Sequence, residues 1–155
     1  MLLEPMIKAN QFMKAALETA TEAGERGEVP VGAVVVSPDG QILAETGNRV
    51  LEMKDPTAHA EMLAIRVACQ ILGNERLEGC DLYVTLEPCA MCAQAISLAR
   101  IRRLYFCADD PKGGGVENGP RVFYHSTCHH RPEIYGGIAQ DKAKQLLRDF
   151  FAARR

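Results

Sequence analysis

The sequence predicts a three-layer α/β/α fold, in which helices cover both faces of a central mixed β-sheet. Three observations indicate this fold. A β-branched run at residues 29–37 is followed by a Pro-Asp-Gly turn and a second strand at residues 41–48, which is typical of a hairpin. Strand and helix patterns then alternate up to residue 108, which favours parallel strands joined by helices. Amphipathic helices are expected before and after these patterns.

The first elements are a helix and the hairpin. A helix is expected over residues 6–23, because Met13, Leu17 and Ala20 can share one face and Gly24 can end it. The strand at residues 29–37 lacks polar alternation, so it should be buried on both faces of the sheet.

The later elements follow a polar loop at residues 49–57. Thr57 is expected to cap a helix over residues 58–72 that ends at Gly73. The other expected elements are a strand at 81–87, a helix at 88–100, a strand at 102–108, a Gly- and Pro-rich loop at 109–121, and a helix at 138–155.

The composition is that of an ordinary globular chain. Its 155 residues suit one domain, residues 1–155, and its net charge of −2 means that any nucleic-acid contact needs a local basic patch. No apolar run approaches the roughly 20 residues of a membrane span, and the start "MLLEPMIKAN" lacks a signal-peptide pattern. We therefore expect a cytoplasmic protein without membrane contact, whose six cysteines are thiols or metal ligands.

The stretch "LEPCAMCAQA" places two cysteines, Cys89 and Cys92, at the start of an expected helix. A redox dithiol has the same spacing and position, because a helix N-terminus lowers thiol pKa values. The pair alone therefore leaves a redox site, a structural metal site and a catalytic metal site open.

The stretch "TAHAE" adds His59 and Glu61 at the start of the preceding helix. Two residues apart on a helix is about 200° of rotation, so these side chains converge only at a point beyond the helix N-terminus. Ligands of such sheets bind beyond the carboxyl ends of the strands, where both helices should begin. The two helix starts can therefore meet around one metal ion.

One His and two Cys form a ligand set that suits Zn²⁺. Three protein ligands leave a fourth position for water, whose pKa zinc lowers toward about 7, so that a zinc-bound hydroxide can act as nucleophile. Glu61 is the candidate proton carrier from that water to the substrate's ring nitrogen and leaving amine.

A structural zinc site with a fourth protein ligand is the main alternative for this cluster. The candidates for that ligand are Cys69, Cys80, Cys107, Cys128, His125, His129 and His130. Neither a structural site nor a redox dithiol explains the carboxylate of Glu61 beside His59. Cys69 and Cys107 fall inside a helix and a strand, where a thiol is usually a small buried hydrophobe.

The pattern His-x-Glu followed by Pro-Cys-x-x-Cys is the general signature of zinc-dependent nucleobase deaminases. The sequence also resembles the bacterial tRNA-specific adenosine deaminases over nearly its whole length. The stretches that carry this resemblance are "EVPVGAVVV", "DPTAHAEMLAI", "DLYVTLEPCAMCAQAI", "RIRRLYFCADDPKGGG", "CHHRPEIYGGI" and "LLRDFFAARR".

The resemblance implies a cytidine deaminase-like fold with a five-stranded sheet and one zinc ion per subunit. It implies hydrolytic deamination of adenosine to inosine at the anticodon wobble position of an arginine tRNA, by a homodimer that contacts the anticodon stem-loop. In the base pocket, the resemblance implies Asn48 as a hydrogen-bonding residue, Val29 and Pro30 as the wall, and Ala60 as a backbone contact to the base. Outside the pocket, it implies that Asp110 and Lys112 contact the anticodon loop and that His130 and Phe150 or Phe151 lie beside neighbouring nucleotides.

Two features of the residues themselves bear on the partner. The tail carries basic side chains around Phe150 and Phe151, a pattern that fits bases stacked beside phosphates. Ile96 and Leu98 look like exposed apolar residues that could serve a dimer. Two functions compete with the tRNA enzyme: a deaminase of a free base or nucleotide, of guanine or cytosine type, and a non-catalytic zinc-stabilised RNA-binding module.

Overall fold

The computed structural model describes residues 3–154, with side chains described from residue 9 onward. Five strands form one sheet in the order β2-β1-β3-β4-β5. Their bounds are β1 Gly32–Val36, β2 Ile42–Gly47, β3 Asp81–Leu86, β4 Arg103–Ala108 and β5 Glu133–Tyr135. The predicted mixed five-stranded sheet is confirmed.

The strand directions decide where a site can form. β1 is antiparallel to both of its neighbours, β2 and β3, while β3, β4 and β5 are mutually parallel. β2 and β3 therefore run in the same direction with β1 between them. The segments that leave β2 and β3 emerge at one edge of the sheet.

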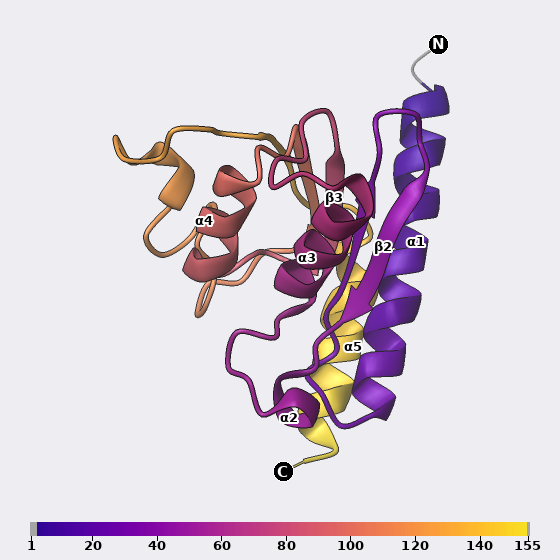
Figure 1. The fold of residues 1–155 in the computed structure, drawn as a ribbon. Helices are drawn as coiled ribbons and strands as arrows, with labels where there is room; N and C mark the ends of the chain where they lie inside the picture. Colours follow the sequence, from indigo (N-terminus) through magenta and orange to yellow (C-terminus); the bar gives the residue numbers. More distant parts are fainter. Residues whose placement is uncertain (1–2, 155) are drawn as a thin grey trace.

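Helices cover both faces of the sheet, as Figure 1 shows. α1 (Leu3–Glu25) and α5 (Gln140–Ala152) lie on one face, and α3 (Ala60–Leu72) and α4 (Ala90–Leu98) lie on the other. The face under α3 and α4 buries aliphatic side chains such as Leu82 and Leu104, and the face under α1 buries Met13 and Val34. Both faces of β1 are buried, as its sequence predicts.

Several local predictions were wrong. The loop at residues 49–57 contains a one-turn helix, α2 (Val50–Met53), whose first N–H groups donate to the buried carboxylate of Glu28. Thr57 does not cap α3, because its hydroxyl donates to Asp55 and the cap position falls on His59. Ile96 is fully buried in the core, whereas Leu98 is 65% exposed.

None of the helices in residues 3–154 combines the length and the apolar character needed to cross a membrane.

Gly32 fixes the distance between α1 and the sheet. A Cβ atom at this position would lie 2.1 Å from the carbonyl oxygen of Ala16 and 2.6 Å from the amide nitrogen of Ala20. Backbone cannot move aside cheaply, so we expect Gly32→Ala to lower the free energy of unfolding by about 3 kcal/mol. Denaturant unfolding would measure this loss. Gly24→Ala, whose Cβ would meet Pro30 at 3.3 Å, should change stability far less.

Candidate active site

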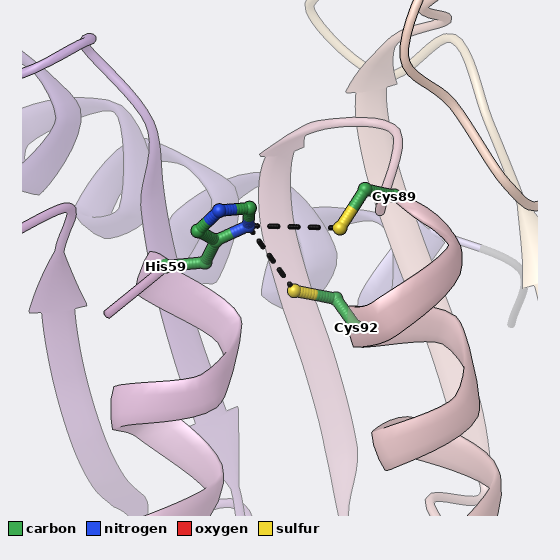
Figure 2. Close-up of side chains that lie close together, drawn as sticks. All are labelled: His59, Cys89 and Cys92. Carbon is green, nitrogen blue, oxygen red and sulfur yellow. Dashed lines mark hydrogen bonds between the residues drawn. The ribbon is translucent and has the colours of Figure 1, made fainter. Parts of the chain in front are cut away.

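Two helix starts at the same edge of the sheet supply the clustered polar groups. His59 is the residue before α3, in extended conformation, and Glu61 lies in the first turn of that helix. Cys89 is the residue before α4, also extended, and Cys92 lies in the first turn. Figure 2 shows that the imidazole of His59 and both sulfur atoms point into the gap between the two helix starts.

The distances in this cluster fit a zinc ion. Nδ1 of His59 lies 3.6 Å from Sγ of Cys89 and 3.5 Å from Sγ of Cys92. Tetrahedral zinc with ordinary Zn–N and Zn–S bond lengths requires an N···S separation of about 3.6 Å. All three ligand atoms lie within 4.8 Å of one another. The side chains are therefore spaced to share one ion.

The charges in the cluster also favour a cation. Hydrogen bonding from the Cys92 thiol, and secondarily from His59, lowers the pKa of Cys89 to about 4. The same interaction with Cys89, together with burial, raises the pKa of Cys92. Without a cation the two sulfurs share one proton, because two adjacent thiolates repel. A bound divalent ion allows both to ionise.

The described part of the chain offers no fourth protein ligand to this cluster. Cys128, one of the predicted candidates, instead lies 3.3 Å from Ser97 Oγ. His125 and His130 bond through their rings to the carbonyl oxygens of Pro120 and Ile101. A three-ligand site that leaves one position open is the arrangement of catalytic zinc.

Glu61 is a buried carboxyl group beside the cluster, with 4% of its surface exposed. Burial raises its pKa, and the neighbouring Cys89 thiolate adds to the increase. It lines the same cavity as His59 and Cys89. The structure therefore brings together a metal site, an acid–base group and a space for a small ring system.

That cavity has a volume of about 610 Å³. Of the residues predicted for the substrate site, Val29, Asn48, Asp110 and Phe150 line it. Arg154, one of the basic residues of the tail, lines it as well. Its wall also contains residues that the sequence did not single out, namely Gly27, Glu28, Val31, Val50, Leu51, Leu86, Glu87 and Gly113. A signal for Glu87 was present, since a carboxylate directly precedes the Pro88-Cys89 pair.

Asn48 joins the cavity wall to the start of α3. Its Oδ1 accepts a hydrogen bond from the amide of Ala60 (2.8 Å), and its Nδ2 donates to the carbonyl oxygen of Val29 (3.1 Å). The carbonyl oxygen of Ala60 accepts from the hydroxyl of Thr46. Asn48 thus holds the first residue of α3, Ala60, which lies between the metal ligand His59 and Glu61.

A second, larger hollow of about 1190 Å³ adjoins the cavity and shares part of its wall. We call it the α5 groove; it lies between α5 and the segment 108–113. Lys112 and Phe151 line it, together with Lys144 and Arg148 of α5. Pro30 is buried and lines neither hollow, and His130 lies in a separate hollow with Arg100 and Arg102.

A metal site of one His and two Cys, with a carboxyl group on the first turn beside the His, defines the class of zinc-dependent deaminases on this α/β/α fold. Residues 6–108 match the model of the cytidine and deoxycytidylate deaminase zinc-binding region. The protein is thus an enzyme of this class, and zinc is its cofactor.

The chain belongs to the family of tRNA-specific adenosine deaminases. It is 57% identical to the tRNA-specific adenosine deaminase of Agrobacterium fabrum (strain C58), over 97% of this chain and 98% of the relative. A solved tRNA:A34 deaminase from work on A-to-I editing at the wobble position matches with a TM-score of 0.87 and 59% identity, covering 88% of this chain and 99% of that one. A guanine deaminase from Nitrosomonas europaea, 24% identical with a TM-score of 0.80 over 92% of this chain and 84% of its own, shares the fold.

Proposed function

We propose that the protein converts adenosine to inosine at the wobble position of the anticodon of an arginine tRNA. The observation that supports this proposal is that the two hollows are neighbours. The cavity with His59, Cys89 and Glu61 and the basic α5 groove share part of their walls, including Val29 and Asp110. A base can enter the cavity while its neighbours lie in the groove.

The proposed reaction adds water to C6 of adenine and releases ammonia. Zinc, when bound, supplies the Lewis acidity that makes water a nucleophile at neutral pH. Glu61 takes one proton from the attacking water and gives it to the ring nitrogen N1, and it then carries the second proton of that water from the oxygen on C6 to the leaving amine. Its burial at 4% exposure keeps this transfer away from bulk water. These roles follow the general chemistry of zinc nucleobase deaminases.

Asn48 and Val29 form the part of the cavity wall that would face the base. One amide hydrogen of Asn48 is used by Val29, which leaves the other for a purine edge. In the same proposal Pro30 supports this wall from behind, and Ala60 acts through its bond to Asn48. The loop nucleotides beside the target would contact Asp110, Lys112, Phe150 and Phe151. His130, which lies in a separate hollow, would contact nucleotides farther from the target base.

The α5 groove supports an RNA substrate more than a free base. Lys112, Lys144, Arg148 and Arg154 line it, against the acidic Asp109 and Asp110. Arg154 lies over the ring of Phe150 at 3.4 Å, and Phe151 is 45% exposed. Positive charge beside exposed aromatic rings suits a single-stranded loop. Arg102 and Arg103, which belong to another basic stretch at residues 100–103, do not add to this charge, because they pair with Asp81 and Glu133.

This assignment predicts the salt dependence of RNA binding. We expect the double variant Lys144→Gln, Arg148→Gln to bind an anticodon stem-loop more weakly. The slope of log K against log salt concentration should be shallower by about 1.4, because each lost phosphate contact changes it by about 0.7 for a single strand. Fluorescence anisotropy at several salt concentrations measures this slope. Lys142→Gln is the matched control, because Lys142 lies on the same helix but lines a hollow against α1. An equal effect in the control would contradict the assignment.

We further propose a cytoplasmic homodimer, since the resemblance implies one. Leu98 of α4 and Ile71 of α3 are 65% and 59% exposed and can contribute apolar surface to an interface between subunits. Sedimentation equilibrium should give twice the mass of the chain, and Leu98→Asp should weaken the association. A monomer at micromolar concentration would contradict the dimer.

The choice of substrate can be tested with one panel. Zinc-loaded protein is given an arginine tRNA anticodon stem-loop and, separately, free adenosine, guanine and cytidine. We expect deamination of the stem-loop alone. Turnover of guanine or cytidine with an inert stem-loop would favour the alternative, a deaminase of free bases. Binding of the stem-loop without turnover of any substrate would favour a non-catalytic RNA-binding module.

A further inference from the structure

Glu87 is a buried carboxylate that the proposed reaction does not use. It directly precedes Pro88 and Cys89 and is 2% exposed. Its backbone N–H donates to the carbonyl oxygen of Ala108, which ties the end of β3 to the end of β4. A carboxylate that is this deeply buried needs several hydrogen bonds. The donors of those hydrogen bonds show which part of the chain the carboxylate holds in place.

Five hydrogen bonds reach this carboxylate, and all come from one segment of the chain. Oε1 accepts from the amide of Asp110 (2.9 Å) and from the side-chain amide of Asn118 (2.6 Å). Oε2 accepts from three successive backbone amides, those of Val116, Glu117 and Asn118, at 2.9–3.0 Å. We call residues 110–118 the substrate loop, because Asp110 and Gly113 line the cavity and Lys112 lines the α5 groove. One side chain thus holds both ends of this loop.

Close backbone packing fixes the same loop against the metal site. The amide of Gly115 donates to the carbonyl oxygen of Pro88 (2.8 Å), and a Cβ atom on Gly115 would lie 2.5 Å from the amide nitrogen of Ala90. A Cβ atom on Gly114 would lie 2.5 Å from Oε2 of Glu87 itself. The backbone of the loop is therefore packed directly against the start of α4 and against the carboxylate of Glu87.

We propose that Glu87 is a positioning residue that shapes the substrate loop and links it to the start of the helix bearing Cys89 and Cys92. It is not among the clustered metal ligands, and the five hydrogen bonds of its carboxylate all come from the loop; it acts by holding Asp110, Lys112 and Gly113 where an RNA loop would pass. This proposal rests on the proposed function for its substrate. The hold of Glu87 on the loop itself is independent of which substrate binds.

Glu87→Gln tests the proposal with a change of equal size. Either orientation of the glutamine amide turns an NH₂ group toward N–H donors, so several of the five bonds are lost. Hydrogen exchange of residues 110–118, measured without substrate, should become about tenfold faster or more. KM for the anticodon stem-loop should rise by a similar factor, with kcat less affected and zinc content unchanged. Glu117→Gln, an exposed position in the same loop, is the matched control.

Gly114→Ala is a second variant that keeps Glu87 and displaces the loop from it, and it should reproduce both effects. Unchanged exchange in folded Glu87→Gln or Gly114→Ala would overturn the proposal. Faster exchange with unaltered KM would overturn it too, because the loop would then have no part in substrate placement. A third outcome separates the two proposals: the wild-type protein deaminates no RNA, but hydrogen exchange of residues 110–118 is still faster in Glu87→Gln. The proposed function would then be wrong, while the proposal that Glu87 holds the loop would be supported.

Discussion

Glu61→Gln should abolish turnover while leaving zinc bound. The substitution keeps the size of the side chain and removes its capacity to carry a proton. General acid–base groups contribute about 10²- to 10⁴-fold, and Glu61 is proposed to act in more than one proton transfer. We therefore expect kcat to fall by at least about 10³-fold, as measured by inosine formation in a stem-loop substrate. Zinc content, measured by atomic emission, should stay near one ion per chain, because Glu61 is not among the clustered ligands.

Glu45→Gln provides the control for this change, since Glu45 is an exposed residue on β2 away from the cavity. It should leave kcat and KM unaltered. If Glu61→Gln retained wild-type activity, the proton route proposed here would be wrong, although the metal site would stand.

Cys89→Ala should remove both zinc and activity. Loss of one ligand from a three-ligand site leaves two, too few to hold zinc against dilution or a weak chelator. We expect zinc content to fall from about one ion per chain to near zero after dialysis, with a parallel loss of turnover.

Cys69→Ala is the matched control, because Cys69 is a partly exposed free thiol in α3 outside the metal cluster. It should retain zinc and activity. Full zinc retention by Cys89→Ala would contradict the ligand assignment. Loss of zinc with retained activity would contradict a catalytic role for the metal.

The sequence predicted the core of this molecule because the determinants are local. The β-branched run of β1, the turn after it and the stop at Gly73 each depend on a few adjacent residues. The metal cluster was also predictable, because the placement of His59, Cys89 and Cys92 at two helix starts follows from the strand directions. The two helix starts lie at the same edge of the sheet because β2 and β3 run in the same direction.

Features that depend on distant partners were not predictable from local patterns. The turn α2 forms where Glu28, more than twenty residues upstream, accepts its first N–H groups. β5 has only three residues and follows Pro132, so its pairing with β4 gives little periodic signal. Thr57 was predicted as a cap because its own side chain suits one, but Asp55 takes its hydroxyl. The role of Glu87 depends on amides 23 to 31 positions away.

The position of the product base decides whether the protein acts on the wobble adenosine. An arginine tRNA anticodon stem-loop with its adenosine at the wobble position is incubated with zinc-loaded protein, beside the same stem-loop with that adenosine moved one nucleotide along the loop. Nuclease digestion and mass spectrometry then identify inosine and its position. We expect inosine at the wobble position and none in the shifted substrate. Equal conversion of both, or conversion of neither while a free base is deaminated, would contradict it.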